Sequence, residues 1–353
     1  SDRRSGALIW AECSVPGLGG QGARSARPLT AQTNQAPPNP VIHRSKAPNP
    51  RRSHDGQMWT TAQLRSKGTP KSEILRKCNA AHRIRRGTYT DDPEDPWVLY
   101  RLRCLAVAQA IRAAVLAGPS AAVVWGLATV DDPPDFVFIR GVTPGRYGED
   151  VKVLSGGTPE TTVHQETSVT SVTWTIIDCA RVMTKRDALV IADCALHRRW
   201  SSLEALRDAA GSLGRAKRMA RVRWVIDHAD PNSESPGETW LRMIVTEAGY
   251  GVRSQVRITE GDFRARVDLM IDGTNVILEF DGLVKYNETD EGTARQAIVD
   301  ERRRQADLEL LGYRVVRFIW EQLRELESTI ARVELAISRS SASVVQGQQQ
   351  AHL

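Results

Sequence analysis

Residues 238–338 constrain the fold most, because the spacing of their apolar residues changes in a fixed order. The spacing is helical at both ends of the segment and includes strand-like alternation between them. The expected elements are a helix over 238–248, strands over 252–258, 264–271 and 276–281, a helix over 292–311, a strand over 313–318 and a helix over 320–338. This order predicts an α/β domain built on a central mixed sheet.

Three carboxylates lie in the second and third strands of this unit. Asp268 interrupts an apolar strand, and Glu279 and Asp281 share one face of the next strand because side chains alternate. A hairpin would bring Asp268 beside the other two. Carboxylates buried together repel one another unless a divalent cation neutralises them. The sequence therefore predicts a Mg²⁺ or Mn²⁺ site formed by Asp268, Glu279 and Asp281, with at least one carboxyl that titrates above its usual value.

The same segment resembles a nuclease family. The matching residues are Ser235-Pro236-Gly237-Glu238, Gln255, Val267-Asp268, Glu279-Phe280-Asp281-Gly282, Arg302 and Gly312-Tyr313-Arg314-Val315-Val316-Arg317. Over about 235–325 this pattern is similar to the PD-(D/E)xK restriction-like nucleases, in the branch of the very-short-patch repair endonuclease. The resemblance implies a restriction-endonuclease-like fold. It also implies that Asp268 and Glu279 are metal ligands, that Glu238 is an auxiliary acid and that Gln255 neighbours the site.

Two departures from the family pattern concern catalysis. The family's Glu-x-Lys is Glu279-x-Asp281 here, so the lysine that orients the attacking water is absent from its position, and we expect Lys285 to replace it. Relatives often carry a His after Asp-Gly, where this chain has Lys285 and Tyr286. In the predicted mechanism a metal-activated water attacks the phosphodiester. Lys285, or an arginine of 300–304, stabilises the developing charge.

Basic charge is concentrated near the N-terminus. The chain has 353 residues and a formal net charge of +6. Residues 1–57 have a net charge of +5 and residues 59–90 of +7, whereas 91–353 carry 32 Lys and Arg against 38 Asp and Glu. A compact basic segment on an acidic remainder is typical of a contact with a polyanion, and a merely solvated face is the alternative.

Residues 58–90 combine this charge with a winged-helix outline. Two short helical segments precede an alternating segment over 82–90, which contains Gly87 and suits a hairpin. Helix, turn, helix and basic wing predict DNA as the partner. The expected DNA-binding residues are Lys71 and Arg76 on the second helix, Arg83, Arg85 and Arg86 in the wing, and Arg302 and Arg303 in the C-terminal unit. For the last two, a solvated helix face is the alternative.

The middle of the chain, 91–230, mixes helical and strand periods and resembles a second family. The likeness is carried by Ser120-Ala121-Ala122, Trp125-Gly126-Leu127 and Thr175-Ile176-Ile177-Asp178-Cys179-Ala180-Arg181. Over about 58–225 the chain is similar to the AbiEi-type abortive-infection antitoxins, which implies a winged-helix transcriptional autoregulator.

These observations divide the chain into five parts. We expect a disordered leader over 1–57, a winged-helix segment over 58–90, a mixed α/β domain over 91–230, the nuclease-like domain over 231–338 and a disordered tail over 339–353. Met58 begins the first readable pattern, so we expect the natural folded chain to start there. The polar linker over 230–237 marks the boundary of the nuclease-like domain.

Composition narrows the classes of function. Five cysteines without a C-x-x-C pair argue against a secreted disulfide framework, and no run of about 18 uncharged apolar residues exists. We predict a cytoplasmic protein with DNA as its partner and no membrane contact; a homodimer and a cognate toxin or antitoxin partner are left open. The first hypothesis is a Mg²⁺-dependent endodeoxyribonuclease acting in phage defence, a toxin–antitoxin system or DNA repair. The alternative is an AbiEi-like regulator with an inert nuclease-like domain.

Overall fold

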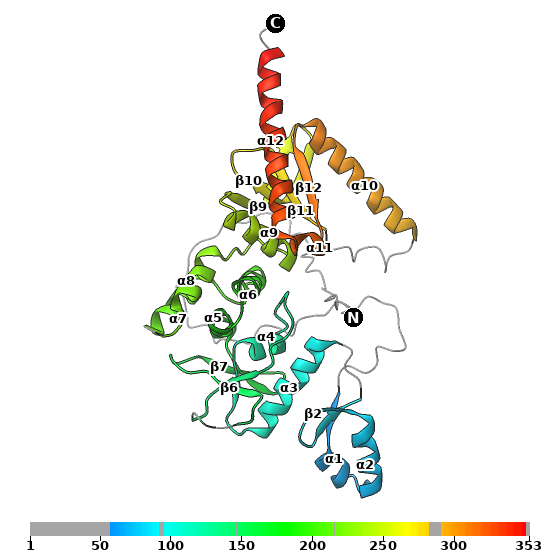
Figure 1. Cartoon of the computed structure of the whole chain (residues 1–353), viewed down its shortest axis with the longest axis vertical. Coiled ribbons are helices and arrows are strands. Elements are labelled where there is room, and N and C mark those ends of the chain that lie inside the picture. The colour runs from blue at the N-terminus through cyan, green and yellow to red at the C-terminus, as the bar shows by residue number, and fades with distance from the viewer. Residues whose placement is uncertain are drawn as a thin grey trace, which may run out of the picture. The chain divides into compact units, whose positions relative to one another are not determined.

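The computed structural model describes residues 57–91, 95–143, 145, 147–214, 216–281 and 291–350, without the side chains of 291–295, 297–298 and 341–350. The predicted leader, except for Gln57, lies outside these residues. The described chain forms two compact units (Figure 1). Unit 1 comprises the described residues up to 126 and those of 132–178, and unit 2 comprises 127–131 and the described residues from 179 onward. Both units mix helices with sheet, which confirms the mixed α/β class.

Unit 1 begins with the basic segment. Its elements are β1 (Met58–Thr60), α1 (Thr61–Ser66), α2 (Lys71–Ala80), β2 (His82–Arg85) and β3 (Thr88–Thr90). The three strands form an antiparallel sheet in the order β1-β3-β2. Thr60 begins α1 because its hydroxyl accepts a hydrogen bond from Gln63, whose side chain accepts one from the Thr60 backbone N–H. The predicted pair of helices and the hairpin are therefore present.

The rest of unit 1 is built on a five-stranded sheet. Its elements are α3 (Pro96–Ala110), β4 (Val115–Leu116), α4 (Pro119–Trp125), β5 (Val137–Arg140), β6 (Val151–Val153), β7 (Thr161–His164), β8 (Thr167–Thr170) and α5 (Val172–Val182). The strand order is β6-β5-β4-β8-β7. α3 ends at Ala110, and the chain then passes through Ala113, whose φ is +64°, into β4.

From 238 onward unit 2 follows the predicted order of elements, except that two helices stand where one was expected over 320–338. It comprises α6 (Lys185–His197), α7 (Leu203–Ser212), α8 (Met219–His228), α9 (Pro236–Glu247), β9 (Val252–Glu260), β10 (Phe263–Ile271), β11 (Val276–Phe280), α10 (Glu291–Leu310), β12 (Arg314–Phe318), α11 (Trp320–Leu323) and α12 (Leu326–Gln350). The sheet order is β12-β11-β10-β9, with β11 and β12 parallel and the other pairs antiparallel. α12 continues into the predicted tail as far as Gln350, and the disordered tail over 339–353 stays a prediction.

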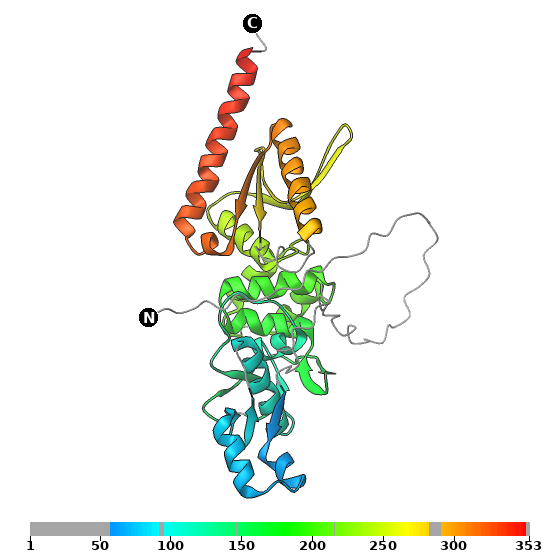
Figure 2. The ribbon, with the colours of Figure 1, turned by 90° about the vertical axis from the view of Figure 1, so that its right-hand side faces the viewer.

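The sheet of unit 2 is covered on both faces. Val276 and Leu278 of β11 pack with Leu241 of α9 and Val333 of α12, whereas Ile277 packs with Leu308 of α10. Neighbouring residues of β11 thus alternate between two cores, as expected for a strand buried on both sides. Figure 2 shows the sheet between α12 (red) and α10 (orange). Among the described helices, none combines the length and apolar character that crossing a membrane requires.

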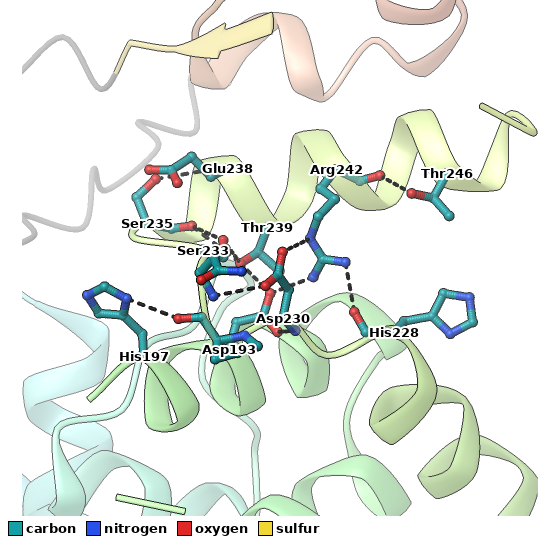
Figure 3. Close-up of polar contacts among 12 residues, drawn as sticks. Asp193, His197, His228, Asp230, Ser233, Ser235, Glu238, Thr239, Arg242 and Thr246 are labelled. Atoms are coloured by element: carbon teal, nitrogen blue, oxygen red, sulfur yellow. Dashed lines mark hydrogen bonds and ion pairs between the residues drawn. The ribbon is translucent and has the colours of Figure 1, made fainter. Parts of the chain in front are cut away.

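A buried polar network joins the linker to α6 and α9 (Figure 3). Asp193 accepts hydrogen bonds from Arg242 Nη2 at 2.7 Å, from the backbone N–H of Asp230 at 2.8 Å and from the hydroxyl of Thr239 at 2.9 Å. Arg242 Nη1 also donates to the carbonyl of His228 at 2.7 Å. These contacts tie the linker into unit 2, and the division between the two units falls within α5. Whether the five predicted parts fold separately stays a prediction.

Candidate functional site

Asp268 and Glu279 lie side by side in the sheet. The β10–β11 register pairs Leu269 with Leu278 and Met270 with Ile277, so one further step places Asp268 opposite Glu279. The backbone N–H of Phe280 donates to Asp268 Oδ2 at 2.9 Å. The Asp268 carboxylate thus takes the place of a backbone carbonyl of β10 as the acceptor for this N–H. It does so where the pairing of β10 with β11 ends. The predicted approach of these two strands is present.

Gln255 lies on the other side of Asp268. It stands in β9 between the pairs Ser254–Leu269 and Val256–Val267, and its φ of +53° interrupts the regular ladder there. Its amide Nε2 donates to Glu238 Oε2 at 2.9 Å. The resemblance implied that Gln255 neighbours the site, and its position in the structure agrees.

Glu238 lies buried in the first turn of α9. Ser235 begins this helix by accepting from the Glu238 backbone N–H at 3.2 Å, and Pro236 fits the first helical position. Glu238 Oε2 also accepts from the backbone N–H of Glu234 at 3.0 Å. These bonds fix a third carboxylate near Asp268.

Burial and the neighbouring carboxylates affect the protonation of Asp268 most. Burial raises the pKa of Asp268 to about 7, and the charges of Glu238 and Glu279 add to this rise against the Phe280 N–H and Arg304. Burial likewise raises the pKa of Glu238. The direction of this shift agrees with the expectation of a carboxyl that titrates above its usual value. Burial contributes more to the raised pKa of Asp268 than the repulsion between carboxylates that we expected. Among the repelling carboxylates, Glu238 contributes most.

Two arginines hold Glu279. Arg304 Nη2 donates to Glu279 Oε1 at 2.7 Å, and Arg317 Nε donates to Glu279 Oε2 at 3.2 Å. Both arginines also bind Glu301, with Arg304 Nε at 2.9 Å from Oε2 and Arg317 Nη2 in contact with Oε1. Burial acts to raise the pKa of Glu301, but the two arginines lower it overall. We call Glu279, Glu301, Arg304 and Arg317 the arginine ring. The charges of its two carboxylates and two guanidinium groups cancel.

The remaining predicted site residues of the nuclease-like part differ in their exposure and in whether the structure describes them. Asp281 is half-buried, and its backbone N–H continues the strand pairing by donating to the Phe318 carbonyl at 2.8 Å. Lys285 lies outside the described residues. Arg302 and Arg303 are exposed on α10, whereas Arg304, one residue further along, reaches the carboxylates.

The expected DNA-binding residues of unit 1 are exposed with one exception. Lys71 and Arg76 lie on the outer side of α2, and Arg83 and Arg86 are exposed in the wing. Arg85 instead donates from Nη2 to the Tyr147 carbonyl at 2.9 Å and lies 3.8 Å from Asp150. The guanidinium of Arg85 is thus engaged within unit 1, and its assignment to DNA stays a prediction.

A divalent cation fits the donor chemistry of the site in part. Asp268 and Glu238 offer hard oxygen ligands whose raised pKa values show that nearby cations do not fully compensate their charge. The two oxygens of Glu279, in contrast, are occupied by arginines. Within the described ranges, no group of three or more His, Cys, Asp or Glu side chains is placed to hold a metal ion. The triad of Asp268, Glu279 and Asp281 stays a prediction.

Replacing Asp268 by Asn should stabilise the metal-free protein at pH 8. The folded pKa of about 7 lies above the ordinary 3.8, so the wild type loses stability as the pH rises from about 4 to about 7. Asn keeps an acceptor for the Phe280 N–H and does not ionise. We expect a gain of roughly 1–3 kcal/mol at pH 8 and none at pH 4, measured by urea unfolding.

Glu279→Gln is the matched comparison for this prediction. It removes a charge that pairs with Arg304 and Arg317, so it should destabilise the protein at both pH values. A stabilising Glu279→Gln at pH 8, with no effect of Asp268→Asn, would contradict the charge distribution described above.

No protein-family model matches this chain, and no curated protein sequence matches it either.

Proposed function

We propose that unit 2 hydrolyses phosphodiester bonds of DNA in a reaction that depends on Mg²⁺ or Mn²⁺. The observation that carries the proposal is the row of Gln255, Asp268 and Glu279 across three strands, with the buried Glu238 bound to Gln255. The order of elements from α9 to β12, with its mixed four-stranded sheet, supports a restriction-endonuclease-like fold.

Each residue of the site has a defined task in this proposal. Asp268 and Glu238 would hold the cation, which when bound neutralises phosphate charge and lowers the pKa of water. Gln255 fixes the orientation of Glu238, and the Phe280 N–H fixes that of Asp268. Arg304 and Arg317 orient Glu279 and present positive charge where the phosphate becomes more negative. Exclusion of water by the cores on both sides of the sheet strengthens these interactions.

Supercoiled plasmid tests the proposal directly. The full chain should nick or linearise the plasmid with Mg²⁺ or Mn²⁺ and leave it intact in EDTA. Asp268→Asn should lower the rate at least ~100-fold, in the range found when one electrostatic stabiliser is removed. Asp272→Asn is the matched control, because Asp272 is half-exposed in the next turn and pairs with Arg253. Intact plasmid with every cation, or full activity of Asp268→Asn, would refute the proposal.

A second candidate function is DNA-dependent regulation by unit 1 without metal. The observation that favours it is the exposed set of cations around α2 and the hairpin, namely Lys71, Arg76, Arg83 and Arg86. In this candidate the helix pair and the β2–β3 hairpin act as a winged helix. Binding of duplex DNA in EDTA, with no cleavage in any metal, would favour it over the first.

Arg83→Ala and Arg86→Ala should each weaken duplex DNA binding. Removing one arginine–phosphate pair should reduce the slope of log affinity against log salt by roughly 0.9. Arg85→Ala should instead lower the melting temperature and leave the slope unchanged, since Arg85 binds Tyr147 within unit 1. The measurement is fluorescence anisotropy at several salt concentrations, with the exposed Arg112→Ala as control. Equal slopes for all four variants would show that the wing does not contact DNA.

A further inference from the structure

The β9–β10 hairpin extends past the sheet. β10 pairs with β11 only at Leu269 and Met270, whereas its pairing with β9 continues to Phe263 and Glu260. Figure 2 shows the hairpin (yellow) extending away from the other two strands. We call residues 256–267 the ribbon.

The two faces of the ribbon differ in character. Val256, Ile258, Ala265 and Val267 pack in one cluster with Leu308 of α10, so this face is covered. The register pairs Arg257 with Arg266 and Thr259 with Arg264, which places these four side chains on the opposite face. All four are exposed. The uncovered face is therefore polar and basic.

The arginines of this face differ in how far their charge is compensated. Arg257 and Arg266 are directly opposite each other, an arrangement of like charges that destabilises a strand pair. Arg266 is paired with Glu234 at 2.7 Å, and Arg264 donates to the Phe263 carbonyl at 2.7 Å. Arg257 has no hydrogen bond or ion pair from its side chain within the part of the chain that the structure describes. Arg257 is exposed and faces a second arginine. Such an arginine is suited to bind a polyanion, which supplies the negative charge that the described part of the chain does not.

The basic face leads to the candidate site. Alternation along β10 puts Arg264 and Arg266 in one series with Asp268. At ~3.4 Å per residue, the two arginines lie about 14 and about 7 Å along the strand from Asp268. The Glu234 that binds Arg266 also donates its backbone N–H to Glu238. A phosphate chain bound along the ribbon would thus reach the carboxylates.

We propose that the ribbon binds duplex DNA and holds its backbone beside Asp268, an inference that rests on the proposed phosphodiester hydrolysis. A two-stranded ribbon fits the major groove of B-DNA, which is about 12 Å wide. Arg257, Arg264 and Arg266 bind phosphates that lie on the order of two to four base pairs from the bond that is cleaved, given the rise of ~3.4 Å per base pair.

Salt-dependent binding tests the ribbon. The full chain carrying Arg83→Ala and Arg86→Ala, which weakens DNA binding by unit 1, is titrated in EDTA with a labelled duplex of about 20 base pairs. Adding Arg257→Gln and Arg264→Gln should lower the affinity several-fold and reduce the log–log salt slope by roughly 0.9 for each phosphate that is no longer bound. Arg207→Gln, an exposed arginine of α7, is the matched control and should change neither quantity.

A stability measurement separates binding from folding. Arg257→Gln removes a like-charge pair, so its melting temperature should not fall while its affinity does. An unchanged salt slope in the Arg257→Gln and Arg264→Gln protein overturns the inference. So does tighter binding of single-stranded DNA or duplex RNA than of duplex DNA.

The two proposals fail in distinguishable ways. Asp268→Asn should keep the wild-type affinity and slope, because it leaves the ribbon arginines in place. If the ribbon variants weaken binding and the wild type cleaves no DNA, the nuclease proposal fails and the ribbon stands. If the wild type cleaves and the ribbon variants bind as it does, the ribbon proposal fails alone.

Discussion

Asp193→Ala should lower the free energy of unfolding of unit 2 by about 3–5 kcal/mol at pH 7, the range for removing one partner of a buried ion pair. The carboxylate is fully buried and binds Arg242, Thr239 and the Asp230 backbone. Its removal leaves the buried guanidinium of Arg242 with the more distant carboxylate of Asp230, 3.9 Å away, and frees the backbone N–H of Asp230. Urea unfolding of the full chain, followed by circular dichroism, measures the change.

The double variant Asp193→Leu with Arg242→Met is the control for this prediction. It removes both charges and fills a similar volume, so it should recover most of the stability that Asp193→Ala removes. A decrease below about 1 kcal/mol for Asp193→Ala would mean that water, rather than Arg242, satisfies the carboxylate.

The same residue sets a pH dependence. Burial raises the pKa of Asp193 to about 6, against the opposing effect of Arg242 and the hydrogen bonds. Because this value lies above the ordinary 3.8, the contribution of Asp193 to stability is greatest below about pH 4 and declines as the pH rises through 6. Asp193→Asn should abolish that decline, which unfolding at several values between about pH 4 and about pH 7 will show.

Gly237→Ala should destabilise unit 2 by about 3 kcal/mol, at the upper end for overpacking. A Cβ at this position would lie 2.1–2.3 Å from three ring atoms of Phe280. The ring has little freedom to move aside, since it packs edge-on against Trp320 with centroids 4.8 Å apart. The strain therefore passes into β11, next to Glu279, and the melting temperature should fall.

A double variant identifies the clash. Phe280→Ala in the Gly237→Ala background should cost much less than the sum of the two single changes, because it removes the ring that the new methyl group meets. Gly211→Ala in α7 is the matched control: its Cβ would meet no atom within 4 Å. We expect it to stabilise the protein by about 0.5–1 kcal/mol through helix propensity. Additive effects of Gly237→Ala and Phe280→Ala would contradict a clash between the new methyl group and the ring.

The order of elements in unit 2 was predictable because it depends on local signals. Alternation in 264–271 and 276–281, with a turn at Asp272 and Gly273, was sufficient to bring Asp268 beside Glu279. The prediction of Glu238 as part of the same site came from the family resemblance. Periodicity alone gives no distance between a helix and a strand.

The arginine ring was not predictable from such signals. Arg304 and Arg317 follow Glu279 by 25 and 38 residues, so their meeting depends on how α10 and β12 pack. A helix turns about 100° per residue, so small changes in the rotation of α10 decide whether Arg302, Arg303 or Arg304 points at the carboxylates. The one available signal was the parallel pairing of a strand containing Arg317 with the strand of Glu279. Arg85 shows the same limit, since only the tertiary structure brings it to Tyr147.

The left-handed backbone of Gln255 has a consequence for the order in which unit 2 folds. For a residue with a Cβ this conformation costs about 1–2 kcal/mol, so the isolated hairpin would avoid it. The Gln255 amide finds its acceptor on Glu238, in another element. We infer that the middle of β9 takes its final conformation late, after α9 has docked on the sheet. The place of Gln255 beside Glu238 then depends on a contact between two elements rather than on the β9–β10 hairpin alone.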